Sequence, residues 1–257
     1  MDWMETMLAG IGRRLISIFE QTGNLMLLFW ETCKRIKDVS WPETFRQMAR
    51  LGVDSLPIVL LTLLATGMVF SIQTAREFVK YGAQASAGGI VAIAMGRELC
   101  PALTGVVVAG RVGAAIAAEI GTMKVTEQVD ALRVMATNPV TYLVAPRFLA
   151  CVLMMPILVV FANAIGNLGG YFVATYYAGI SNYTYLHSIE VFAETLDITG
   201  GLLKSMVFGG IIATVGCYKG LTTEQGAEGV GLSTTASVVL SIILIFLSNY
   251  FLSLVIY

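Results

Sequence analysis

Arg97 and Glu98 are the residues of this chain with the clearest potential for chemistry, because they lie next to each other and close to Pro101 inside an apolar stretch. A charged side chain at the centre of a bilayer costs about 2.5–3.5 kcal/mol on insertion scales. Neighbouring helical residues point in different directions, so each charge needs its own partner or water. Arg97 and Glu98 either line a polar pocket, where they meet a lipid phosphate and headgroup, or join neighbouring helices.

Pro101 adds to this picture, because a proline inside a helix leaves one backbone carbonyl without its donor. Irregular backbone at membrane depth lines a cavity or contacts protein. Both interpretations of Arg97 and Glu98 therefore stay open at this point.

Residues for catalysis or metal binding are scarce. His187 is the only histidine and lies in the predicted outer loop beside Tyr183 and Tyr185, which is typical of a solvated loop residue. The glycine-rich segment 226–231 lacks the lysine of a phosphate-binding loop, so we expect a tight turn there, with Ser233 or Thr234 starting the last helix. We therefore predict no catalytic residue, no metal site, no cofactor and no enzymatic activity. The cysteines are widely spaced and read as small core residues: Cys33, Cys100, Cys151 and Cys217.

The composition is that of an integral membrane protein. Of the 257 residues 56% are hydrophobic and 13% are charged, and the mean hydropathy is +0.77. A net charge of −1 argues against nucleic-acid binding as the main role.

We predict an all-α fold with about five transmembrane helices, because five regions supply roughly 20 mostly apolar residues each. The second and third regions are long and contain Pro101, Pro146 and Pro156, so kinked or extended helices are expected and a seven-span division is the alternative. The five regions are Val53 to Ala75, Ala87 to Gly121, Tyr142 to Ile180, Leu202 to Lys219, and Leu232 to Tyr257.

Lysine and arginine predict the orientation through the positive-inside rule. Basic residues gather before the first span and around the loop after the second, which we therefore place in the cytoplasm together with the N-terminus. The segment 181–201 has acidic residues and no Lys or Arg, which favours the opposite face. The basic residues are Arg13, Arg14, Lys34, Arg35, Lys37, Arg46, Arg50, Lys124, Arg133 and Arg147.

Residues 1–50 mix large apolar and basic side chains, a pattern typical of amphipathic helices in the membrane interface. A soluble amphipathic extension is the alternative. We accordingly divide the chain into an interfacial region, 1–50, and a transmembrane domain, 51–257. The apolar members are Trp3, Leu8, Ile16, Phe19, Leu27, Phe29, Trp30 and Trp41.

A ridge of small residues runs directly into a charged amphipathic segment. The ridge recurs every fourth residue and predicts close packing against another helix; it consists of Gly105, Ala109, Gly113, Ala117 and Gly121. After it, Val125, Val129, Leu132 and Ala136 form one stripe. This spacing predicts a short helix at the membrane surface, capped by Thr126.

Two long stretches, RELCPALTGVVVAGRVGAAIAAEIGTMKVTEQVDALRVMATNPVTYLVAPRFLA and GAEGVGLSTTASVV, resemble the MlaE (YrbE) family of ABC-transporter permeases. The resemblance runs from about Leu51 to the end of the chain. It implies a homodimeric permease in the inner membrane of a Gram-negative-type bacterium, with a plastid envelope as an alternative location. The implied function is to move phospholipid between the inner and outer membranes and help maintain outer-membrane lipid asymmetry.

The resemblance also implies partners and site residues. The partners are a separate ABC ATPase subunit that hydrolyses ATP, an MCE-domain periplasmic protein and, in many systems, a small STAS-domain subunit. The segment Lys124 to Met135 is similar to the family's cytoplasmic coupling helix, with Lys124, Glu127, Gln128, Asp130 and Arg133 as the residues that contact the ATPase. The family's lipid pocket maps onto Phe70, Phe78, Tyr81, Arg97 and Glu98.

Two other classes of function compete with this one. A secondary transporter of a small solute would explain the charges beside a proline-broken span, but no inverted repeat is evident and a self-contained carrier needs no docking helix. A structural membrane scaffold would explain the small-residue ridge but not Arg97 and Glu98.

Overall fold

The computed structural model describes residues 2–224 and 226–257, and within α1 (Asp2–Arg35) it describes the exposure of Gly12, Ile16 and residues 19–35. No strand occurs in this described part, which confirms the all-α class. Five helical stretches in it are long and apolar enough to cross a membrane, so the five-span prediction is confirmed. They are Trp41–Lys80, Gln84–Val125, Val140–Tyr176, Thr195–Leu221 and Gly226–Ile256.

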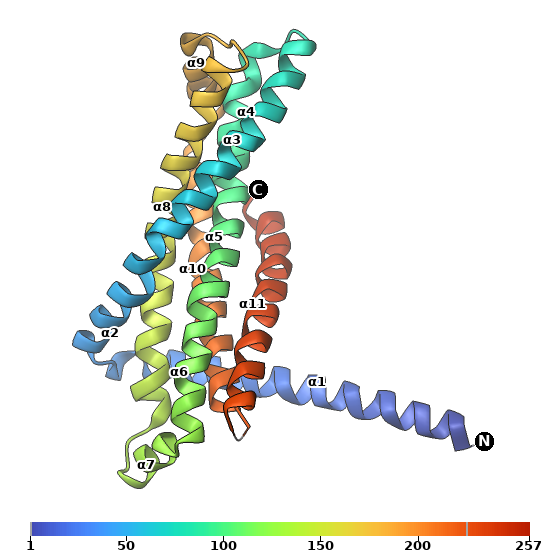
Figure 1. Ribbon diagram of the computed structural model, residues 1–257, viewed down its shortest axis with the longest axis vertical. Helices are drawn as coiled ribbons and strands as arrows, with labels where there is room; N and C mark the ends of the chain where they lie inside the picture. Colours follow the sequence, from blue (N-terminus) through green and yellow to red (C-terminus); the bar gives the residue numbers. More distant parts are fainter. Residues whose placement is uncertain (1, 225) are drawn as a thin grey trace.

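The five stretches run alternately up and down one long axis (Figure 1). The first contains α2 (Trp41–Gln47) and α3 (Leu56–Lys80). The second contains α4 (Ala87–Ala94), α5 (Cys100–Val108) and α6 (Ala114–Val125). The last three are α8 (Ala145–Tyr176), α10 (Thr195–Leu221) and α11 (Gly226–Ile256). Two short helices lie at opposite ends of the bundle, α7 (Gln128–Val134) and α9 (Asn182–Phe192). We call these two ends the α7 end and the α9 end.

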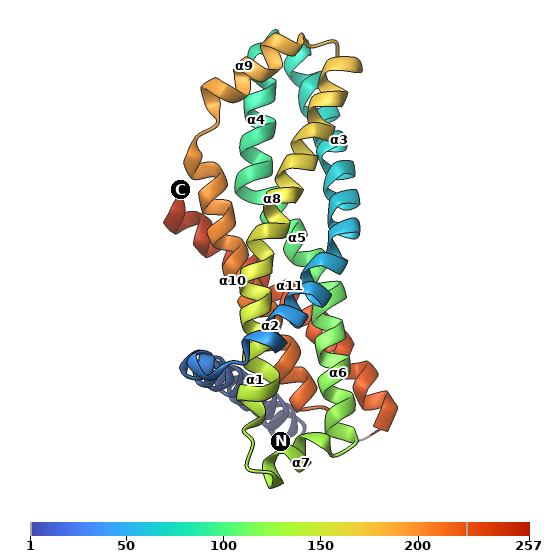
Figure 2. The ribbon, with the colours of Figure 1, turned by 90° about the vertical axis from the view of Figure 1, so that its left-hand side faces the viewer.

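Helix α1 lies across the bundle near the α7 end and projects from its side (Figures 1 and 2). Large apolar side chains on it are exposed, among them Phe19, Leu27 and Trp30, and a place in the membrane interface stays a prediction. The side chains of Trp3 and Leu8 lie outside the described residues. The stretch Trp41–Lys80 passes through residue 50 as one helical run, and the division of the chain at that residue stays a prediction.

The small-residue ridge packs as predicted. Ala109 and Ala117 are completely buried. A Cβ at Gly105 would touch Ile245 of α11 and Phe208 of α10 at 3.5 Å, and one at Gly113 would lie 3.4 Å from Ile212. The ridge therefore brings the second stretch against both α10 and α11.

The last two spans begin earlier than the sequence predicts. The last helix begins at Gly226 rather than at Ser233 or Thr234, because Gly226 adopts φ 92° and makes the turn itself. Helix α10 begins at Thr195, seven residues before Leu202, because Glu194 and Asp197 form a capping box. A search for apolar residues places the start of a span after its polar capping residues, so the predicted start was too late.

Helices α3 and α8 approach each other closely where glycine faces glycine. A Cβ placed on Gly67 would overlap the backbone carbonyl of Gly166. The overlapping atoms belong to the backbone, so rotation of a side chain cannot relieve the clash.

We expect Gly67→Ala to lower the free energy of unfolding by about 1–3 kcal/mol, since overpacking a close contact forces the backbones apart. The control is Gly231→Ala, because a Cβ there meets nothing within 4 Å and alanine is about 1 kcal/mol better than glycine in a helix. Thermal unfolding of the detergent-solubilised protein measures both. Equal melting temperatures for the two variants would contradict the packing account.

Candidate functional site

Helix α7 is a short, mostly exposed helix joined to two spans. It follows α6 after a sharp turn at Glu127, which has φ 61°, and it is anchored to the bundle by Val129, which is completely buried. The turn means that α7 cannot continue the direction of α6. Only a few residues separate α7 from α6 on one side and from the third span on the other.

The predicted cap of this helix was wrong. The Oγ1 of Thr126 donates to the carbonyl of Thr122, in the last turn of α6, at 2.8 Å. Glu127 occupies the capping position instead, without a side-chain capping bond. Thr126 lies one residue too early to cap α7, because its hydroxyl donates back into the last turn of α6 and Glu127 stands at the N-cap.

Among the five predicted ATPase contacts, the structure brings three charges together. Lys124 Nζ lies 2.9 Å from Asp130 Oδ2, and Arg133 Nη1 lies 2.9 Å from Asp130 Oδ1. Glu127 and Gln128 lie between Lys124 and Asp130 in the sequence and are exposed at the start of α7. The hydrogen bond from Lys124 is the largest cause that holds the pKa of Asp130 below its ordinary value, and the charge of Arg133 lowers it further.

We expect Lys124→Met to raise the pKa of Asp130 toward its ordinary value. The folded-state pKa lies below the unfolded one, so the contact stabilises the segment above the unfolded-state pKa, and this contribution is lost as pH falls through the folded-state pKa. A ¹³C NMR titration of labelled aspartate, with Asp130→Asn to assign the signal, measures the change. The control Lys37→Met removes a lysine that is exposed and outside the segment; an identical Asp130 titration in both variants would contradict the assignment.

The sequence prediction missed the apolar surface of α7. Val134 is 88% exposed and Met135 is 66% exposed, at the end of the helix next to the charged group. Neither lies in the predicted stripe, which was assigned from periodicity alone. An exposed valine and methionine beside paired charges are typical of a protein contact surface.

Polar contacts tie the α7 end to the rest of the chain. Glu119 of α6 pairs with Arg50 at 3.3 Å and with Arg147 of α8 at 3.2 Å. Asn138, which follows α7, donates to Glu31 of α1 at 3.3 Å. These contacts link α6 and the segment after α7 to α1, α8 and the start of the first span.

A second group of polar residues lies inside the membrane-spanning part, and we call it the Lys204 cluster. Its members are Arg97, Glu98, Asp197, Lys204, Asn249, Ser253 and Tyr257. They come from the proline-broken second stretch, from α10 and from α11. The cluster therefore joins three spans.

Lys204 is the centre of this cluster, because its side chain is completely buried. Its Nζ donates to Glu98 Oε1 at 2.8 Å, to Ser253 Oγ at 2.7 Å and to the backbone carbonyl of Arg97 at 3.0 Å. That carbonyl is the one from which Pro101, four residues later, withholds a donor. The lysine thus supplies the hydrogen bond that the proline removes.

Arg97 and Glu98 have separate partners, as their adjacency predicts. Arg97 pairs with Asp197 and lies over the ring of Tyr257, and Glu98 also accepts from Asn249 at 2.7 Å. Of the two interpretations, these contacts favour the one in which Arg97 and Glu98 join neighbouring helices. Both side chains are also partly accessible, 33% for Arg97 and 41% for Glu98, so contact with a lipid stays a prediction.

Sequence reasoning did not identify Lys204 or the role of Asp197. A lone lysine within an apolar span was the available signal for the first. Asp197 was assigned to the outer segment because α10 was expected to begin at Leu202, whereas its side chain is almost fully buried.

The three aromatic residues predicted for lipid binding lie apart from the Lys204 cluster. Phe70 of α3 lines a small pocket of about 370 Å³ together with Gln73 and Leu99. Phe78 packs at the α9 end against a separate apolar group. Tyr81 lies just beyond α3 and is exposed. The structure thus brings Arg97 and Glu98 into one cluster and places Phe70, Phe78 and Tyr81 in other surroundings.

Comparison with known proteins gives consistent matches over most of the chain. The family model described as Permease MlaE matches residues 44–255. A probable ABC transporter permease protein of Synechocystis sp. is 46% identical over 241 residues, which are 94% of this chain and 90% of that protein. A protein of Rickettsia felis with the same description is 40% identical over 248 residues, 95% of each chain.

A plant protein is also similar. Protein TRIGALACTOSYLDIACYLGLYCEROL 1, chloroplastic, of Arabidopsis thaliana is 42% identical over 215 residues, which are 84% of this chain and 61% of that protein. The name of this plant protein includes the name of a galactolipid, trigalactosyldiacylglycerol.

Proposed function

The chain belongs to the MlaE permease family, and from this premise we propose that it is the membrane-spanning subunit of an ABC transporter that moves phospholipid between the inner and outer membranes. The chain is a multi-pass permease subunit. The observation that carries the proposal is α7, an exposed helix with an apolar end that is tied to several spans through Glu119 and Asn138. A self-contained carrier needs no such helix.

A separate ATPase subunit is the proposed partner of α7. Binding and hydrolysis of ATP would move α7, and the ion pairs of Glu119 would carry this motion into α8 and the first span. Lys124, Glu127, Gln128, Asp130 and Arg133 are the proposed polar contacts, with Val134 and Met135 as the apolar ones. The permease itself performs no catalysis in this scheme.

The α7 end is proposed to face the cytoplasm, together with the N-terminus and α1. Basic residues support this placement, because Lys34 and Arg35 of α1 and the basic residues of α2, α6 and α7 belong to helices near this end (Figure 1), while the segment 181–201 has none. An MCE-domain protein would then meet the α9 end, where Tyr183, Leu186 and Val191 are exposed.

We propose that two copies of the chain form the transport path. Only 28% of the apolar stretch containing α3 and 11% of that of α11 are buried within the chain, against 50–61% in the other three. These two helices flank α5 and α6 in Figure 1, which fits an interface that closes over the pocket of Phe70 and Leu99. A shared cavity would also receive the accessible sides of Arg97 and Glu98, with Phe78 and Tyr81 toward its outer end.

Phospholipid is the proposed cargo, supported by the apolar pocket of Phe70 and Leu99 and by the galactolipid in the name of the plant relative. The family resemblance supports a bacterial inner membrane, a STAS-domain subunit and a role in outer-membrane lipid asymmetry. The plant relative keeps a plastid envelope as the alternative location.

Affinity purification from the native membrane tests the proposal. Wild-type chain is expected to bring down an ATPase, an MCE-domain protein and phospholipid, identified by mass spectrometry. Glu127→Lys/Asp130→Lys is expected to lose the ATPase and keep the MCE protein, because α7 and α9 lie at opposite ends (Figure 2). Wild-type chain purified without any ATPase would overturn the proposal and favour the secondary transporter.

A further inference from the structure

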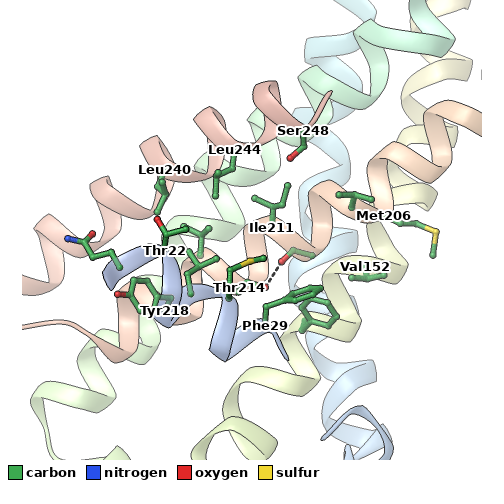
Figure 3. Close-up of a pocket in the computed structure, with 17 residues that line it drawn as sticks. Thr22, Phe29, Val152, Met206, Ile211, Thr214, Tyr218, Leu240, Leu244 and Ser248 are labelled. Atoms are coloured by element: carbon green, nitrogen blue, oxygen red, sulfur yellow. Dashed lines mark hydrogen bonds between the residues drawn. The ribbon is translucent and has the colours of Figure 1, made fainter. Parts of the chain in front are cut away.

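A second pocket lies outside the proposed transport path, between α1, α8, α10 and α11 (Figure 3). Its volume is about 720 Å³, within the range of pockets that hold small ligands. It shares no residue with the pocket of Phe70 and Leu99. The Lys204 cluster contributes no side chain to it either.

The walls of this pocket are apolar. Leu240 and Leu244 of α11 face Ile211 of α10 across it, and Phe29 of α1 closes it near Val152 of α8 (Figure 3). Thr214 donates its hydroxyl to the carbonyl of Gly210 at 2.7 Å, so it presents no free hydroxyl hydrogen to the pocket. Such walls suit a hydrocarbon chain.

One end of the pocket is polar. Thr22 of α1 and Tyr218 of α10 lie together at this end in Figure 3. Lys219 follows Tyr218 in the last turn of α10, and its Nζ lies 3.5 Å from Oε1 of Gln21, another residue of the lining. An apolar pocket with a cation at one end matches a molecule with a hydrocarbon chain and an anionic head.

The size separates a lipid chain from a partner helix. A transmembrane helix about 10 Å wide and about 30 Å long fills roughly 2,400 Å³, whereas the pocket offers about 720 Å³. A single acyl chain is narrow enough to enter between α1 and the bundle without separating them.

We propose that this pocket binds a glycerophospholipid of the surrounding leaflet, with one acyl chain beneath α1 and its phosphate beside Lys219. This lipid is not cargo. It holds α1 against α10 and α11, so the position of α1 depends on the lipid composition of the leaflet. The inference stands on this pocket alone and does not need the proposed transport function.

Photo-crosslinking tests the site in the full chain, purified with the subunits that accompany it and placed in nanodiscs of phosphatidylethanolamine and phosphatidylglycerol. The probe is phosphatidylglycerol with a diazirine on one acyl chain, and peptide mass spectrometry locates the label. We expect label on α10 between Met206 and Tyr218 and on α11 between Leu240 and Ser248.

Two substitutions on α11 give a matched comparison. Leu244→Trp fills the pocket and is expected to lower the label at these positions about tenfold, because an overpacked site excludes the chain. Leu247→Trp makes the same change at a residue outside the lining and is expected to leave the label unchanged. Lys219→Gln is expected to lower it several-fold, since a charge-assisted contact to phosphate is lost.

Two results would overturn the proposal. Equal labelling in Leu244→Trp and Leu247→Trp would mean that the pocket holds no acyl chain. A benzophenone amino acid at position 244 that crosslinks to a partner polypeptide, with no lipid label in the pocket, would identify a protein occupant. Wild-type chain that purifies without an ATPase would contradict the proposed function, but the photo-crosslinking test would still decide whether the pocket binds lipid.

Discussion

Replacing Lys204 with methionine is expected to lower the free energy of unfolding by about 3 kcal/mol. Removing one partner of a buried ion pair costs roughly 3–5 kcal/mol, and the low end applies because Glu98 keeps 41% of its side chain exposed. Lys204→Met strips the carbonyl of Arg97 and the hydroxyl of Ser253 of the same donor. Unfolding of the purified protein in detergent, followed by circular dichroism, measures the loss.

A double-mutant cycle separates the ion pair from general disruption. Glu98→Gln with Lys204→Met is expected to be more stable than the sum of the two single losses predicts, because the double variant has no unpaired charge. The control Lys37→Met removes an exposed lysine and is expected to change stability by at most about 0.5 kcal/mol. A Lys204→Met protein as stable as wild type would contradict the central place of Lys204 in the cluster.

The second large effect concerns binding rather than folding. Val134→Asp/Met135→Asp is expected to weaken association with the ATPase by about 30-fold or more, since apolar residues at the centre of an interface contribute 2 kcal/mol or more. Both side chains are exposed in the isolated chain, so the change leaves the permease folded. Binding of the purified ATPase to permease in nanodiscs, followed by biolayer interferometry, gives the affinity.

The matched control is Val134→Ile/Met135→Leu, which keeps the surface apolar and of similar size. It is expected to bind the ATPase like wild type. If the aspartate and control variants bound equally well, α7 would not be the site where the ATPase docks.

The sequence predicted the spans well because they depend on local composition. In a membrane the backbone N–H and C=O groups of an apolar run must be paired with each other, and a helix does this. Four-residue spacing alone placed Gly105 and Gly113 on a packed face. Pro101 likewise predicted a carbonyl without its donor, from covalent structure alone. Each of these predictions depends only on residues that lie close together in the sequence.

The remaining features depend on contacts between distant segments. The sequence predicted Asp197 in an outer loop. In the structure its buried carboxylate pairs with Arg97, one hundred residues earlier. Nothing in the local pattern connects Lys204 to Ser253. The pocket between α1 and α10 is equally invisible in the sequence, since it exists only because α1 lies across the bundle.

ATP-driven movement of phospholipid is the most direct test of the proposed function. The complex purified from its native membrane is placed in vesicles containing a fluorescent phospholipid, and transfer between acceptor vesicles and the reconstituted ones is followed with and without ATP. We predict transfer that requires ATP and is lost in Val134→Asp/Met135→Asp. Transport of a solute by the chain alone, driven by an ion gradient and unaffected by ATP, would contradict the account.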